Sequence, residues 1–171
     1  MAWKDNMKTT NIAYVEKRLF YGLLYKLCMT IPEPIYTFGR PTASVRDIIF
    51  SIGLKIYNNY SGRKAFIDLV YAQKLGYIKK APHFNTITDF LNKPTVYSLL
   101  QKLLIVSAKP LNQYSIEYIE SNSVKERLSN CLTLKCKNQV SQRNELMMKF
   151  ICSNICCLIQ EIYGGQNDNS K

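Results

Sequence analysis

Helical spacing of apolar residues is the feature that most restricts what this chain can fold into. Apolar side chains recur every three or four residues in several successive stretches, and prolines and glycines separate these stretches. In residues 44–59, for example, the apolar stripe consists of Val45, Ile48, Ile49, Ile52 and Ile56. The pattern predicts a mainly α protein with little or no sheet, in which about five short helices form a helix-turn-helix-like cluster and a long amphipathic helix follows.

Breaks and capping residues give the expected boundaries. The expected helices are residues 11–30, 44–59, 61–76, a short helix that starts at Asn85 or Thr86 and ends before Pro94, a fifth helix after Pro94, and a last one from Ser141 to the pair Gly164 and Gly165. Ser44 followed by Asp47 is similar to a capping box at the start of the second helix.

The composition and the hydrophobic periodicity of the sequence change beyond Pro110. The segment that follows is polar and weakly patterned, and the hydrophobic periodicity returns only near Ser141. We therefore expect three parts: a helical region over residues 1–111, a junction over residues 112–140, and a C-terminal helix with a polar tail over residues 141–171.

The charge of the chain is strongly positive. The formal net charge is +11, and residues 1–110 contain 16 Lys and Arg against 6 Asp and Glu. An excess of cations attracts polyanions such as nucleic acid, or an anionic membrane surface. The charge therefore points to a polyanionic partner for the first two thirds of the chain.

Cations cluster at the expected turns and helix starts, where side chains and backbone amides can both meet phosphates. The candidate DNA contacts are Arg40, Arg46, Arg63, Lys64, Lys79, Lys80 and Asn85. Arg40 lies in a Gly-Arg-Pro turn that is similar to the minor-groove finger of AT-hook peptides. The alternative is a structural turn on an ordinary solvated surface. The one histidine, His83, has no nucleophile or acid-base partner near it in the sequence.

The six cysteines leave two interpretations open. The N-terminus lacks the apolar core of a signal peptide, which favours reduced thiols, and charged and polar residues interrupt the most apolar run, so we expect no transmembrane segment. Cys131, Cys136, Cys152 and Cys156 could hold zinc. The spacing of Cys152 and Cys156 on one apolar helix face favours buried thiols instead.

The order of several motifs resembles the N-terminal region of bacterial and archaeal insertion-sequence transposases with an Asp-Asp-Glu catalytic core. The likeness covers about residues 19–111. Its motifs are a Pro-rich turn, Gly-Arg-Pro at residues 39–41, an aliphatic helix, Tyr-Ser-Gly-Arg at 60–63, Gly-Tyr-Ile-Lys-Lys-Ala-Pro-His-Phe-Asn at 76–85, and Ala-Lys-Pro-Leu at 108–111. The segment from Val124 onward resembles the extreme C-terminus of the same family, so the two ends of a transposase are joined here without the middle.

The resemblance implies a DNA-binding chain without strand-transfer chemistry. Intact members use Mg²⁺ held by paired aspartates in an RNase H-like sheet, and both aspartates are missing here, so we assign no catalytic residue, metal ligand or cofactor. The expected partners are DNA and, through the C-terminal helix, a second copy or a full-length transposase, with no membrane partner. The expected location is the cytoplasm, at the nucleoid. Two alternatives stay open: a helical protein-interaction or transposition-regulating module, and a small zinc module for RNA.

Overall fold

The structure is a computed structural model that describes residues 2–33, 43–113 and 134–164, with the side chains of residues 2–13, 62, 63, 163 and 164 excepted. Its elements are α1 (Ala2–Met29), α2 (Val45–Tyr57), α3 (Gly62–Lys74), α4 (Phe84–Leu91), α5 (Val96–Ala108), the 3-10 helix η1 (Lys109–Gln113) and α7 (Gln139–Gly164). The described residues contain no strand. The mainly α fold and the long C-terminal helix are therefore confirmed.

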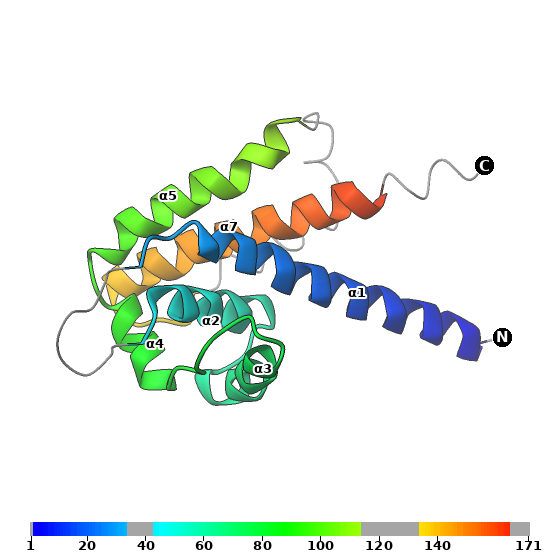
Figure 1. Cartoon of the computed structure of the whole chain (residues 1–171), viewed down its shortest axis with the longest axis horizontal. Helices are drawn as coiled ribbons and strands as arrows, with labels where there is room; N and C mark the ends of the chain where they lie inside the picture. Colours follow the sequence, from blue (N-terminus) through cyan, green and yellow to red (C-terminus); the bar gives the residue numbers. More distant parts are fainter. Residues whose placement is uncertain (1, 34–42, 114–133, 165–171) are drawn as a thin grey trace.

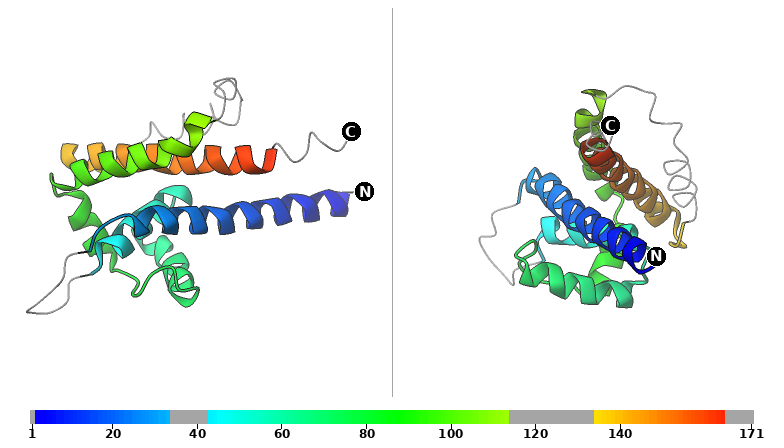
Figure 2. Two further views of the ribbon diagram at one scale, coloured as in Figure 1. Left: turned by 45° about the horizontal axis from the view of Figure 1, so that its top comes forward. Right: turned by 90° about the vertical axis from the view of Figure 1, so that its right-hand side faces the viewer.

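The helices α1, α5 and α7 run alongside one another (Figure 1). Helix α7 runs in the same direction as α5 and antiparallel to α1, so the start of α1 and the end of α7 lie on the same side of the molecule (Figures 1 and 2). The helices α2, α3 and α4 gather on the other side of α1 from α5. Two views in Figure 2 show α5 and α7 as one layer and the α2–α4 cluster as the opposite one.

One continuous core connects these helices. Its fully buried side chains include Phe20 and Leu24 of α1, Ile49 of α2, Leu100 of α5 and Ile151 of α7. At Gly53 of α2, an added Cβ would lie 2.6 Å from a methyl group of Leu24 and 2.9 Å from the methyl group of Met148. A glycine at this position lets α1, α2 and α7 meet.

The C-terminal helix α7 finds its packing partner within the chain. It contacts α5 most extensively, and also α1 and α2. Its buried apolar side chains are Met148, Ile151, Cys152, Ile155, Cys156 and Ile159. The apolar stripe that the sequence places on this helix is thus covered by the N-terminal helices.

Several helix ends differ from those expected. Helix α1 begins at Ala2, well before residue 11, and α7 begins at Gln139. Helix α4 begins at Phe84, and its N-cap is His83, whose Nδ1 accepts the backbone N–H of Asn85 at 3.3 Å. Asn85 and Thr86 were expected to cap this helix because short polar residues favour caps, but the imidazole of His83 can accept the same hydrogen bond.

Two buried polar residues fasten α7 to segments far away in the sequence. The side-chain amide of Asn144 donates to the backbone oxygens of Leu91 at 2.8 Å and Lys93 at 3.1 Å, at the end of α4. The carboxylate of Glu145 accepts the backbone N–H groups of Lys135 at 3.0 Å and Cys136 at 2.9 Å. Both contacts satisfy backbone groups that would otherwise be costly to bury.

Candidate nucleic-acid interface

The described carboxylates mostly bond within the protein. Asp47 and Glu145 are buried, and each accepts backbone N–H groups. Asp68 is half-buried and accepts from the Lys17 ammonium at 3.3 Å and from the side-chain amide of Asn58 at 2.8 Å. Asp89 is the one exposed carboxylate in the described ranges. Little negative charge therefore faces solvent from this part of the chain.

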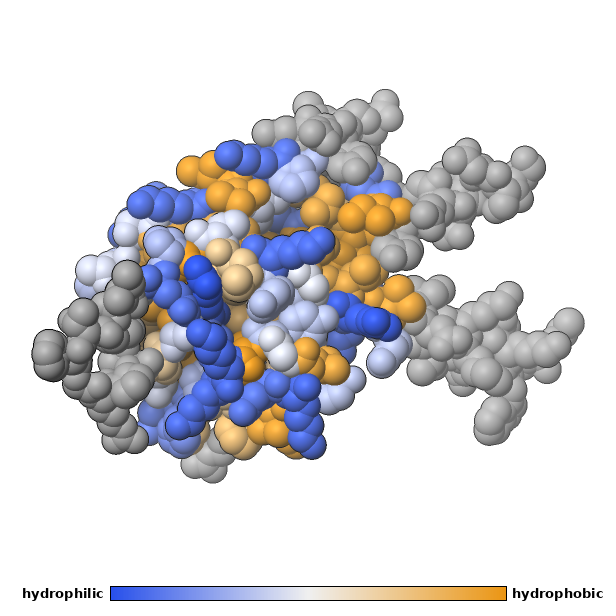
Figure 3. Space-filling model, in the orientation of Figure 1, coloured by the Kyte–Doolittle hydropathy of each residue, from blue (hydrophilic) through white to orange (hydrophobic). Residues whose placement is uncertain are grey.

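The described cations behave in the opposite way. Those with exposed side chains are Arg18, Lys26, Lys64, Lys74, Lys79, Lys80, Lys93, Lys102, Lys109, Lys135, Lys137 and Arg143. In Figure 3 hydrophilic side chains cover much of the visible face over α2 and α3, with apolar patches between them. The positive net charge of the sequence is thus carried on the outside of the described fold, where it can meet a polyanion.

The loop between α3 and α4 is fixed by Asp47. The Asp47 carboxylate accepts the backbone N–H of Lys79 at 3.1 Å and that of Lys80 at 3.3 Å. Burial raises the pKa of this carboxyl above its ordinary value, against the lowering effect of the Lys80 and Lys79 N–H groups. The two lysine side chains, by contrast, remain exposed. Asp47 therefore holds two cations at defined positions beside the first turn of α2.

The capping-box expectation is half correct. The hydroxyl of Ser44 accepts the backbone N–H of Asp47 at 3.4 Å, as such a cap requires. The Asp47 side chain does not return to the cap, because it bonds the loop of Lys79 and Lys80 instead. The local pattern predicted that Asp47 would cap the helix end, but Asp47 makes a tertiary contact instead.

Arg46 also has an internal role. Its Nε donates to the backbone oxygen of Ile31 at 2.7 Å, just beyond the end of α1. The side chain is half-buried, and Nη1 lies 3.9 Å from the sulfur of Met29. Arg46 thus joins α1 to α2, and only part of its guanidinium faces solvent. We call Arg46, Lys79 and Lys80 together the basic corner.

The segment that contains Arg40 is anchored at the basic corner. Residues 34–42 lie outside the described ranges, so the Gly-Arg-Pro turn is not placed. The segment lies between Glu33 and Ala43, and the side chains of Glu33 and the next residue, Ser44, are hydrogen-bonded to each other. Glu33 is also 3.9 Å from the Lys79 ammonium. The chain therefore enters and leaves this segment next to Lys79.

The other predicted contacts are not all brought together. Lys64 is exposed near the start of α3, whereas Lys79 follows its end, and ten residues of helix separate them by about 15 Å along the axis. The side chain of Arg63 lies outside the described part. Asn85 is exposed in the first turn of α4. The structure thus groups Arg46, Lys79 and Lys80, and places Lys64 elsewhere.

Backbone amides at the expected turns are occupied within the protein. Asp47 takes the N–H groups of Lys79 and Lys80, and His83 takes that of Asn85. The expectation that amides and side chains together meet phosphates does not apply to these three N–H groups. A phosphate at this surface would meet lysine side chains.

The cysteines of the described part are mostly interior. Cys28, Cys152 and Cys156 are buried in the apolar core, which confirms the expectation of buried thiols for the last two. In the described residues, no group of three or more His, Cys, Asp or Glu side chains is arranged to hold a metal ion. Cys131, one of the four suggested zinc ligands, lies outside them.

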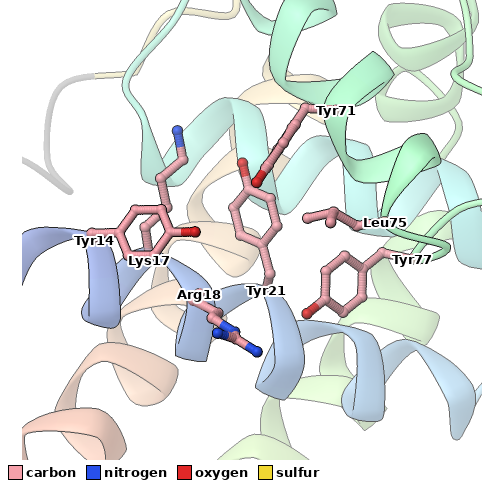
Figure 4. A pocket seen from close by; sticks show the side chains of 7 residues that line it. All are labelled: Tyr14, Lys17, Arg18, Tyr21, Tyr71, Leu75 and Tyr77. Atoms are coloured by element: carbon pink, nitrogen blue, oxygen red, sulfur yellow. The ribbon is translucent and has the colours of Figure 1, made fainter.

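The sequence did not predict the pocket that lies between α1 and α3. Its aromatic lining consists of Tyr14, Tyr21, Tyr71 and Tyr77 (Figure 4). Their convergence depends on how α1 crosses α3, which no local pattern encodes.

Comparison of the chain with protein-family models, with curated proteins and with solved structures gave no match. The resemblance to insertion-sequence transposases therefore stays a prediction. Among the described helices, none has the length and apolar character needed to cross a membrane.

Proposed function

We propose that this chain binds duplex DNA through its cationic exterior, and that it is an internally deleted insertion-sequence transposase that no longer cuts or joins strands. The observation that carries the binding proposal is the separation of charge: most described carboxylates bond within the protein, whereas most described cations are exposed. Contacts of this kind are made with phosphates and do not depend on base sequence.

The basic corner is the best-supported contact surface. Its lysine side chains are exposed while their backbone is held by Asp47. Little backbone conformational entropy is therefore lost when a phosphate binds. The segment with Arg40 begins and ends beside them. An arginine supplied from that segment would add to the same surface.

The binding test is a titration of the protein into a fluorescently labelled duplex of about 20 base pairs. Fluorescence anisotropy measures the affinity at several salt concentrations between about 50 and 200 mM. Each phosphate contact contributes about 0.9 to the slope of log affinity against log salt. The double variant Lys79→Ala with Lys80→Ala should lower the affinity and reduce that slope by about 2. The matched control is Lys102→Ala with Lys109→Ala, two exposed lysines on α5 and η1.

Two results would contradict the proposal. Wild-type protein that ignores duplex DNA at low salt would exclude it, and equal effects of the two double variants would remove the basic corner as the contact surface. The proposed origin has its own test in the genome, where an intact copy should carry a catalytic block between residues 111 and 124.

A further inference from the structure

The pocket between α1 and α3 has the walls of a site for a planar ligand. It encloses a volume of about 450 Å³, which is within the range of small-molecule sites. Tyr14 and Tyr71 are 61% and 47% exposed, so these two residues of the lining are accessible to a ligand. Leu75 adds an apolar side chain from the end of α3 (Figure 4).

The inner wall is rigid. The Tyr21 and Tyr77 rings meet edge to face with their centroids 5.8 Å apart. Tyr77 also stacks on Phe50 at 5.8 Å and meets Tyr25 at 5.6 Å. Aromatic contacts of this geometry are stabilising and fix ring orientation. The pocket is therefore formed before any ligand arrives.

The buried ring of Tyr21 lines this pocket. Tyr21 is only 2% exposed, and its hydroxyl lies beside the side-chain amide of Asn58, which also donates to Asp68 at 2.8 Å. Burial raises the pKa of Tyr21, and the Asp68 carboxylate raises it further, so the hydroxyl keeps its proton at every physiological pH.

Positive charge borders the same pocket. Arg18 is exposed and makes no ion pair within the described part of the chain. Lys17 lies 5.8 Å from the centre of the Tyr21 ring, and it is paired with Asp68 at 3.3 Å. The charge of Asp68 is paired with Lys17, and its carboxylate also accepts from the Asn58 amide. Arg18 is thus the cation available to an anionic group.

We propose that this pocket binds one nucleotide, with the base against the rings of Tyr14 and Tyr71 and the phosphate at Arg18. Every base presents a flat π-face, and stacking on tyrosine does not require a particular sequence. The nucleotide is either a free monophosphate or an unpaired unit of a single strand, because the two share this chemistry. The inference does not rest on duplex binding at the basic corner.

The experiment uses three probes with the full chain: thymidine monophosphate, an oligothymidylate of about eight nucleotides, and a strand of the same length and charge that lacks its bases. Wild-type protein should bind the oligothymidylate more tightly than the abasic strand. Tyr71→Ala should weaken binding of the oligothymidylate roughly 5- to 100-fold and leave the abasic strand unchanged. Tyr60→Ala, at an exposed tyrosine outside the pocket, is the matched control.

Competition separates the two sources of the ligand. Displacement of the oligothymidylate by thymidine monophosphate assigns the pocket to free nucleotides, and binding of the strand alone assigns it to unpaired DNA. Equal affinity of wild-type protein for the strands with and without bases would overturn the proposal, as would failure to bind either probe that carries a base.

Tyr21→Phe provides a second, independent variant. It keeps the ring of the inner wall and removes only the buried hydroxyl, so nucleotide affinity should be unchanged. A lower unfolding midpoint with unchanged affinity would show that the hydroxyl is structural. Duplex binding in the salt titration should be unaffected by Tyr71→Ala, so failure of the pocket and failure of the basic corner give different results.

Discussion

The carboxylate of Asp47 on α2 accepts the backbone N–H of Lys79 at 3.1 Å, across 32 positions of sequence. This contact connects the stability of the helical cluster to the position of two exposed cations, Lys79 and Lys80. The carboxylate itself is buried, yet it determines where these two positive charges are presented.

Asp47→Ala should lower the free energy of unfolding by about 1–3 kcal/mol, because the N–H groups of Lys79 and Lys80 lose their acceptor. Urea denaturation measures this change. Asp89→Ala, at an exposed carboxylate on α4, should change it by less than about 0.5 kcal/mol. Equal effects of the two substitutions would mean that the loop does not depend on Asp47.

Asn144→Asp tests the attachment of α7 to α4. The substitution keeps the shape of the side chain but replaces the amide donor with a carboxylate that faces the backbone oxygens of Leu91 and Lys93. The repulsion and the buried charge should lower the free energy of unfolding by about 3 kcal/mol or more at neutral pH. Part of that loss should be recovered on acidification, because protonation restores a donor.

Much of the fold could be predicted from the sequence, whereas the packing of the site could not. The stripe of Ile48, Ile49 and Ile52 on α2 is a local periodic signal, and it placed both the helix and its buried face correctly. The partner of Asp47 lies 32 residues away, so the sequence around Asp47 gave only the capping pattern. The tyrosine pocket depends in the same way on how two helices cross.

Glu145→Ala should destabilise the segment before α7. Glu145 accepts the N–H groups of Lys135 and Cys136, and it lies 3.6 Å from the buried ammonium of Lys149. Removing a buried carboxylate with these contacts should lower the free energy of unfolding by about 3 kcal/mol. Glu161→Ala, near the other end of the same helix, should have a small effect in the same urea titration.

The same carboxylate predicts a pH dependence. Burial by itself would raise the pKa of Glu145, but the N–H of Cys136, its thiol, the N–H of Lys135 and the charge of Lys149 bring it below the ordinary value. Because the folded pKa is lower than the unfolded one of about 4.3, this group stabilises the fold above about pH 4.3. That contribution is lost as the pH falls through the lowered pKa. In Glu145→Gln, the free energy of unfolding should therefore depend less steeply on pH across this acidic range than it does in the wild-type protein.

The thiols of Cys28 and Cys136 should resist alkylation in the native protein. Burial raises the pKa of Cys28 to about 12, and burial together with Glu145 raises that of Cys136 to about 11. Because the thiolate is the reactive form, both should react with iodoacetamide far more slowly at about pH 8 than they do in denaturant. Mass spectrometry of the labelled peptides follows each site. Native labelling of Cys28 at the denatured rate would contradict its burial.

The position of α7 among α1, α2 and α5 has a consequence for how the chain is made. The hydrophobic core cannot form completely until the ribosome has synthesised the turns of α7 that carry Ile151 and Ile159. Until then, the apolar faces of the earlier helices remain exposed. A nascent chain halted before Gln139 should therefore aggregate or recruit a chaperone, and only release of the last helix should make it soluble.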